Sequence, residues 1–197
     1  LNWGGTLAHD AAVTKYEQKA FKAHLGLAFN ANRVNELKRE PYQPNFYKNM
    51  QFLWLHKETQ TLKSSFIFLN RGIESADTTI KYTQTFGTNT SLRISKKIGL
   101  KGIYYQQIGR DMDNRKVNAH FLSAQLLMNP TEKLKLTIGT ERTSGTDQNL
   151  FDDPNEERST FDILYGLLHG HFGYIDYFYV LIDPIFGVTD TYLKVNY

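Results

Sequence analysis

Residues 21–31 read FKAHLGLAFNA. Every second residue from Phe21 to Ala31 is apolar, whereas Lys22, His24 and Asn30 occupy positions between them. Apolar residues that recur with period two lie on one side of a β-strand, because successive side chains point to opposite faces of a sheet. This segment is therefore predicted to form a strand with one apolar face and one polar face.

The same alternation continues along the chain, and no segment shows a helical period. Near residues 46–57, the apolar face is expected to carry Phe46, Met50, Phe52 and Trp54. The whole chain, residues 1–197, is predicted to be one all-β region. Its strands are expected near 17–32, 46–57, 61–73, 78–87, 91–109, 116–128, 133–143, 173–182 and 190–197.

The predicted connections alternate in length. Short turns rich in Gly, Asn, Thr or Pro are expected at Glu58–Gln60, Gly87–Thr90 and Asn129–Lys133, and longer links at 33–45, 70–79, 109–116 and 144–172. Antiparallel up-and-down transmembrane β-barrels of outer membranes combine short turns on one side with long loops on the other. A soluble β-sandwich also alternates apolar and polar residues, so the alternation by itself fits either class.

Composition excludes several classes of protein. The chain of 197 residues has no cysteine, which excludes disulfides, thiolate metal sites and a cysteine nucleophile. No apolar run is long enough for a membrane-spanning helix. The formal charge of +3 is too mild to predict a nucleic-acid partner. Because single-chain bacterial barrels have an even number of strands, nine predicted strands indicate a section of a larger barrel.

The segment from residue 137 to residue 195 resembles a known family. It contains ERTSGTD at 141–147, FDILYG at 161–166 followed by His169, FGYIDYF at 172–178 and DTYLKV at 190–195. These blocks are similar to those of the alginate-export porins of Gram-negative outer membranes, although Leu167-Leu168 stands where the family has Thr-Asn. The resemblance implies an outer-membrane β-barrel of about sixteen to eighteen strands with a basic lumen, which passes acidic polysaccharide or smaller solutes.

The predicted polar face carries an excess of cations, which is the main functional signal in the sequence. A channel wall of this kind attracts anions and raises their local concentration. Arginine can bind a carboxylate through two hydrogen bonds, and lysine acts as a mobile point charge. The predicted lumen or anion-binding residues are Lys22, Lys63, Arg71, Lys81, Arg93, Lys97, Lys101, Lys135, Glu141, Arg142, Asp176, Asp190 and Lys194.

No enzyme, catalytic residue, metal site or cofactor is predicted. The sequence contains no G-x-S-x-G, H-E-x-x-H or Gly-rich phosphate loop. His169 and His171 lack an evident third metal ligand. An acidic group in the 144–172 loop lacks the ordered spacing of a calcium loop and is expected to be hydrated; it comprises Asp147, Asp152, Asp153, Glu156 and Glu157.

Two features of the C-terminal third lead to further expectations. An aromatic group is expected to form a girdle at the membrane interface or, alternatively, a platform for sugar stacking; it comprises Tyr165, Tyr174, Tyr177, Phe178 and Tyr179. The 144–172 loop contains an apolar stretch, Phe161–Leu168, and is expected to fold inward as a constriction.

The sequence thus favours a passive outer-membrane channel with a basic lumen. Its expected partners are membrane lipid and lipopolysaccharide outside the barrel, and small anions or anionic oligosaccharide inside it. One alternative is a structural or binding barrel that contacts other envelope proteins without transport. Another is a soluble β-protein that binds carbohydrate.

Overall fold

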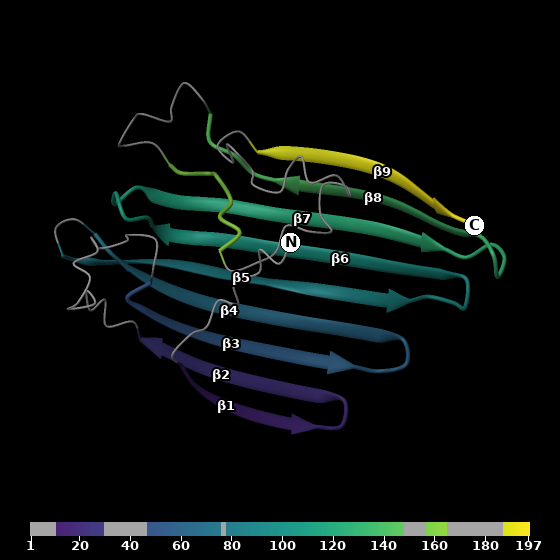
Figure 1. Cartoon of the computed structure of the whole chain (residues 1–197), viewed down its shortest axis with the longest axis horizontal. Coiled ribbons are helices and arrows are strands. Elements are labelled where there is room, and N and C mark those ends of the chain that lie inside the picture. The colour runs from purple at the N-terminus through teal and green to yellow at the C-terminus, as the bar shows by residue number, and fades with distance from the viewer. Residues whose placement is uncertain (1–10, 30–46, 76–77, 148–156, 165–186) are drawn as a thin grey trace, which may run out of the picture.

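The computed structural model describes residues 11–29, 47–75, 78–147, 157–164 and 187–197. These residues form nine strands, each hydrogen-bonded in antiparallel fashion to its neighbours in the chain (Figure 1). The strands are β1 (Ala11–Gln18), β2 (Phe21–Phe29), β3 (Asn49–Glu58), β4 (Leu62–Glu74), β5 (Ile80–Arg93), β6 (Ile98–Arg110), β7 (Lys116–Met128), β8 (Lys135–Thr143) and β9 (Val188–Asn196). The predicted all-β, up-and-down organisation is confirmed for this part of the chain.

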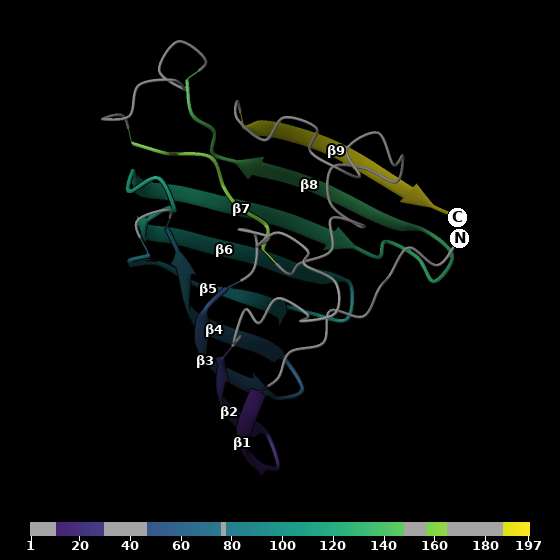
Figure 2. The same ribbon diagram turned by 60° about the vertical axis from the view of Figure 1, so that its left-hand side comes forward.

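The strands build one twisted, curved sheet, and the turning of β1 relative to β9 is visible in Figure 2. Among the described residues the sheet is open, because β1 pairs only with β2 and β9 pairs only with β8. The described part of the chain contains no helix long and apolar enough to cross a membrane.

Successive connections lie at opposite ends of the sheet. The turn end carries the links at 19–20, 59–61, 94–97 and 129–134, and the loop end carries those at 30–48, 75–79, 111–115 and 144–187. Two links at the loop end are shorter than predicted, since β4 pairs with β5 as far as Glu74 and Ile80, and β6 pairs with β7 as far as Arg110 and Lys116. Residues 70–74 of the first predicted link, and residues 109, 110 and 116 of the second, therefore belong to strands.

The predicted turn at Gly87–Thr90 is wrong, because β5 runs straight through these residues. Gly87 lies directly opposite Tyr105 of β6, and a Cβ atom at Gly87 would overlap the Tyr105 ring and the Tyr104 carbonyl. Gly26 opposite Phe52 and Gly139 opposite Tyr192 repeat this arrangement. Glycine thus marks close approach of an aromatic ring here and not a chain reversal.

The first strand also differs from the prediction. The segment predicted as one strand near 17–32 contains the end of β1, a turn at Lys19 and Ala20, and β2. This turn contains no Gly, Pro, Asn or Asp, the residues from which a turn is usually predicted. Lys19 adopts a positive φ of 42°. The strand predicted at 173–182 lies outside the described residues.

The sheet has two faces of different character. Residues 157–164 lie across one of them, the covered face, which contains for example Leu69, Gln107 and Phe121. The opposite, open face carries eighteen of the large apolar side chains that are exposed, among them Leu25, Phe68 and Leu193. The open face is therefore apolar without being packed against anything in the described part of the chain.

Strand β3 is an exception to the predicted polarity. Met50, Phe52 and Trp54 lie on the covered face with the charged residues, as the register with β4 requires. The apolar face of β3 was assigned wrongly because Leu53 and Leu55, on the open face, are apolar too. Met50 is buried because it packs in a cluster with Ala28, Tyr47 and Leu69, against which Phe52 and Leu164 also pack.

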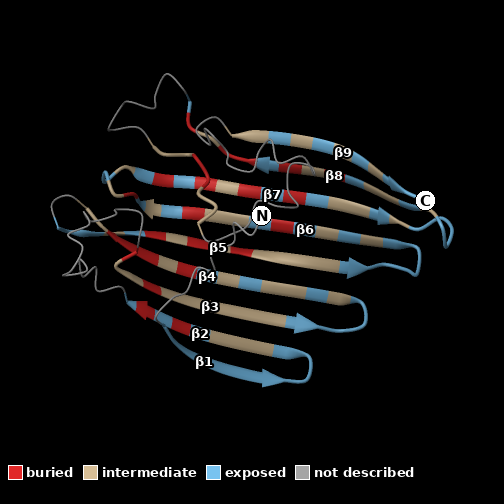
Figure 3. Ribbon diagram, viewed as in Figure 1, coloured by how far each residue is buried: buried red, intermediate tan, exposed pale blue. Residues whose placement is uncertain are grey.

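Buried residues gather toward the loop end of the sheet, as the red segments of Figure 3 show. Besides the Met50 cluster, a second core forms from Ile103, Ala119, Phe121 and Phe161, with Tyr105 and Ile163 packed against it. Both clusters lie on the covered face. The turn end of the same face remains intermediate or exposed, for example at Lys63, Arg93 and Lys135.

Candidate functional site

The cation-rich face predicted from the sequence is largely one face of the sheet. Register places ten of the predicted lumen residues on the covered face; they are Lys22, Lys63, Arg71, Lys81, Arg93, Lys101, Lys135, Glu141, Asp190 and Lys194. They span β2 to β9 and divide into a group near the loop end and a group near the turn end.

Three of the predicted residues do not join this set. Lys97 lies in the turn between β5 and β6, where its backbone N–H donates to the Ser95 hydroxyl at 3.1 Å. Arg142 lies on the open face, because Glu141 beside it in β8 points to the covered face. Asp176 lies outside the described residues, as do His169, His171 and the predicted aromatic group at 165–179.

A short segment, which we call the covering segment, crosses the covered face near the loop end. Residues 157–164, drawn in light green in Figure 1, run over β7 and β6. Arg158 forms a bridge with Val117 of β7, and the Phe161 ring lies 5.9 Å from that of Phe121. Leu164 then packs against the Met50 cluster. Of the apolar stretch Phe161–Leu168, residues 161–164 thus lie against the covered face, and residues 165–168 lie outside the described part.

The Asp162 residue links this segment to the sheet through both its backbone and its side chain. Gln107 is only 1% exposed, and its amide donates to the Asp162 carbonyl at 2.7 Å while it accepts the Asp162 N–H at 2.8 Å. The Arg71 guanidinium donates to the Asp162 carboxylate at 2.9 Å. A buried cation at the loop end is therefore neutralised by a carboxylate from the covering segment.

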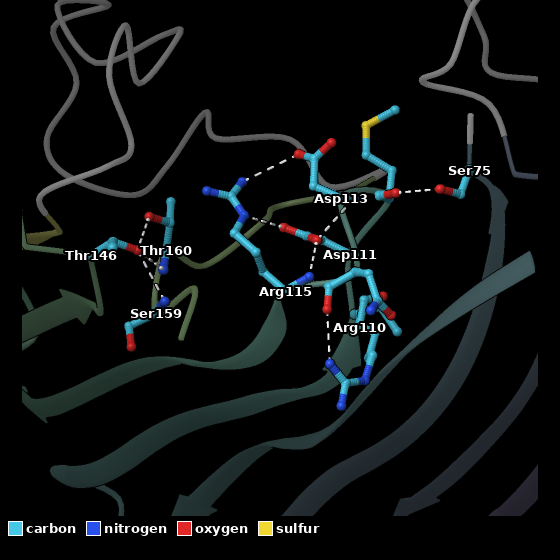
Figure 4. A network of polar contacts seen from close by, with 11 residues as sticks. Ser75, Arg110, Asp111, Asp113, Arg115, Thr146, Ser159 and Thr160 are labelled. Carbon is cyan, nitrogen blue, oxygen red and sulfur yellow. Dashed lines mark hydrogen bonds and ion pairs between the residues drawn. The ribbon is translucent and has the colours of Figure 1, made fainter. Parts of the chain in front are cut away.

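Hydroxyl groups hold the segment against residues 144–146, which follow β8 (Figure 4). The Thr146 hydroxyl accepts the N–H groups of Ser159 at 3.0 Å and of Thr160 at 3.2 Å, and it bonds the Thr160 hydroxyl at 2.9 Å. The Ser144 hydroxyl donates to the Ser159 carbonyl at 2.6 Å. These hydroxyls satisfy backbone groups that would otherwise be buried without a partner.

The link between β6 and β7 forms a second rigid feature at the loop end. Asp111 is buried, and its carboxylate accepts the N–H of Asp113 at 3.0 Å, the N–H of Arg115 at 2.8 Å and the Arg115 Nε at 3.1 Å. Ser75 donates to the Met112 carbonyl at 2.7 Å, which ties this link to the one between β4 and β5 (Figure 4). Hydrogen bonds that do not involve the covering segment thus hold the links at the loop end together.

Two carboxylates face each other on β8 and β9. Glu141 is 1% exposed and accepts a hydrogen bond from the Ser123 hydroxyl at 3.1 Å. Asp190 is its direct partner across the strands. Both carboxylates belong to the covered face, as predicted.

The turn end of the covered face brings cations together. Lys63 and Lys101 flank Ser91 in directly paired positions of β4, β5 and β6, and Arg93 lies two residues farther along β5. They line a cavity of about 370 Å³ whose single lining carboxylate is Glu58. Glu58 lies 3.5 Å from the Lys63 ammonium. Among the described residues, Arg93 and Lys101 have no ion pair, so positive charge predominates in this cavity.

Sequence reasoning missed a row of paired histidines beside these cations. His24 lies 2.8 Å from Glu17, and His56 lies 3.3 Å from Glu58. The Trp54 ring lies between the two imidazoles, stacked on His56 with ring centroids 5.3 Å apart. The alternation of Trp54, His56 and Glu58 could have placed them on one face, but the contact with Glu17 depends on β1, which was not predicted.

The acidic group of the 144–172 loop is described only at Asp147 and Glu157. Glu157 pairs with the Lys116 ammonium at 2.6 Å. This hydrogen bond, with a further one from Asn118, holds the pKa of the Glu157 carboxyl below its ordinary value of 4.5. No group of three or more potential metal ligands is found in the described part of the chain.

Comparisons of the chain with known protein families, with curated proteins and with solved structures find no match. Functional assignment therefore rests on the residues and their arrangement.

Proposed function

We propose that these residues are a section of an outer-membrane β-barrel of the alginate-export type. In this proposal the complete barrel is a passive channel, and the covered face lines a basic lumen through which anionic solutes or acidic polysaccharide pass. The open face would meet lipid. Cofactors and catalysis have no part in this function.

The observation that carries the proposal is the distribution of side chains between the two faces. Exposed apolar residues occupy the open face of every strand from β4 to β9 in the described structure, as at Phe68, Leu100 and Leu193. Soluble monomers rarely expose contiguous apolar patches of more than a few hundred Å². Lipid would shield the apolar side chains of this face from water. The charged covered face would remain hydrated.

The dimensions of the strands support the same proposal. Strands β4 to β7 contain 13 or 14 residues each. A tilted strand needs about nine to eleven residues to cross the hydrocarbon core. These strands therefore have residues to spare beyond both interfaces.

The cations at the turn end supply the chemistry for anion passage. Lys63, Arg93 and Lys101 share one open cavity and could contact successive carboxylates of a polymer through several weak interactions. Weak, repeated sites suit conduction, because a tightly bound anion would not leave.

A second candidate function is a barrel that binds envelope proteins without transport. The observation that favours it is the covering segment, which is anchored on the covered face by Phe161 and Asp162 and occupies space that a lumen would need. The two candidates differ in whether an open path remains beside this segment.

Reconstitution of the full natural chain separates these functions. A folded barrel should migrate differently on gels before and after heating and should require detergent. In planar bilayers under a salt gradient, we expect an anion-selective reversal potential and block by acidic oligosaccharides. A folded barrel with no conductance would support the binding function, and a protein that is soluble without detergent would contradict both.

A further inference from the structure

Arg142 interrupts the polarity of the open face. The open-face residues of β8 are Leu136, Ile138, Thr140 and Arg142, in order from the turn end to the loop end. Arg142 is exposed, lies directly opposite Leu122 of β7 and Thr189 of β9, and has no ion pair among the described residues. A cation on a lipid-facing surface is costly at mid-membrane and is tolerated near the interface.

The apolar band of β7 ends at the same level. Its open-face residues are apolar from Met128 to Leu122 and then become His120, Asn118 and Lys116 toward the loop end. Lys116 is already paired with Glu157 at 2.6 Å. Arg142 and His120 are therefore neighbouring basic side chains at the border of the apolar band.

A cavity of about 430 Å³ opens at this border. Its lining includes Arg142, His120, Ser144 and Thr189. The volume lies in the range of small-molecule sites, about 300–1,000 Å³. The Ser144 hydroxyl is engaged with Ser159 and the His120 backbone, so the Arg142 guanidinium and the His120 ring are the groups that can turn to a ligand.

We propose that this cavity binds a phosphate group of an anionic lipid in the outer leaflet. The Arg142 guanidinium would hold two phosphate oxygens through paired hydrogen bonds, and His120 would donate a further one. The acyl chains would lie along Leu122, Ile138 and Leu193, which continue the open face toward the turn end. This proposal rests on the proposed function, because it requires the open face to meet lipid.

The position of the cavity favours a lipid over a free anion. A cation beside an exposed apolar band matches a molecule with a phosphate at one end and hydrocarbon at the other. A free phosphate would gain nothing from Leu122 or Ile138. The loop end is also the side at which an outer-membrane barrel carries its longer loops, which face the outside and the lipopolysaccharide leaflet.

The test uses the full chain in phosphatidylcholine vesicles that contain diphosphorylated lipid A. Lipid A that remains with the purified protein is quantified by mass spectrometry for wild type, Arg142→Gln, His120→Ala and the control Arg93→Gln, which changes a cation at the other end of the other face. We expect Arg142→Gln to weaken retention about tenfold, His120→Ala to weaken it less, and Arg93→Gln to leave it unchanged.

Two additional arms identify the ligand. Dephosphorylated lipid A should be retained no better by wild type than by Arg142→Gln, and excess inorganic phosphate should not displace the diphosphorylated lipid. Equal retention by wild type and Arg142→Gln would overturn the inference, and displacement by inorganic phosphate would reassign the cavity to free anions.

Insertion is measured on the same samples by heat-modifiable gel mobility. If wild type inserts but retains no more lipid A than Arg142→Gln, the lipid site is contradicted and the barrel proposal stands. If wild type fails to insert, both are contradicted.

Discussion

The loop end and the turn end of the covered face both carry cations, but these cations differ in burial and in ion pairing. At the loop end, Arg71 has a side chain only 11% exposed and lies 2.9 Å from the Asp162 carboxylate of the covering segment. At the turn end, Lys63, Arg93 and Lys101 line an accessible cavity with one carboxylate. Arg71 is thus buried in an ion pair where residues 157–164 cover this face, whereas Arg93 and Lys101, beyond the segment, have no ion pair among the described residues.

The first way to break this comparison is to remove the apolar anchor of the segment. Phe161→Ala deletes a buried ring that packs on Ile103, Ala119 and Phe121, and should weaken docking of the segment by about 3 kcal/mol. Hydrogen–deuterium exchange of the amides at 158–164 should accelerate strongly, while those of β4 to β6 change little.

The matched control is Leu193→Ala, which removes an apolar side chain that is 65% exposed on the open face. It should leave exchange at 158–164 unchanged. Equal acceleration in both variants, or none in Phe161→Ala, would show that the segment is not held by this contact.

The second prediction concerns the ion pair between the segment and the sheet. Asp162→Asn leaves the buried Arg71 guanidinium without a carboxylate, and should destabilise the docked segment by about 1–3 kcal/mol. Because Asp162 is 34% exposed, the loss should be smaller than for a fully buried pair.

A double-mutant cycle with Arg71→Met sharpens this result. The cation is absent in Arg71→Met, so Asp162→Asn should then have little effect on exchange at 158–164. Additive effects of the two substitutions would indicate that the two charges do not interact.

These contacts separate what the sequence could predict from what it could not. Period-two alternation correctly assigned ten charged residues to one face because side-chain direction in a strand is a local property. The partner of Arg71 lies 91 residues away, and nothing local identifies it. The burial of Phe161 was predictable from its apolar character, but the hydrogen bonds between Asp162 and Gln107 were not.

Some errors were avoidable and others were not. Glu141 and Arg142 are adjacent in one strand, so parity alone excludes them from sharing a face. Gly87, in contrast, has the same local signature as a turn glycine, and only the Tyr105 ring from the next strand shows why glycine is needed there. The turn at Lys19 and Ala20 likewise lacks any residue that predicts it.

The third prediction tests the accessible end under the proposed channel function. Replacing Lys63 and Lys101 together by Gln removes two of the cations that line the cavity, and should shift the reversal potential in a salt gradient toward cation permeability. The control Lys57→Gln removes a cation from the same end but from the open face, and should leave selectivity unchanged. Equal shifts in both would mean that general surface charge, and not this cavity, sets selectivity.

The smallest expected effect lies at the start of the covering segment, where Glu157 pairs with Lys116. The pKa of Glu157 is lowered in the folded chain because the carboxylate accepts hydrogen bonds from Lys116 and Asn118. A lowered pKa means that the carboxylate stabilises the docked segment above the ordinary pKa of 4.5, and that this contribution disappears as the pH falls through the folded value. Since the Lys116 side chain is 68% exposed, the contribution should be only a few tenths of a kcal/mol. Exchange at 158–164 should therefore be slightly faster in Glu157→Gln than in wild type at neutral pH, and the difference should vanish in acid; a difference that persists below the folded pKa would show that the carboxylate charge is not its cause.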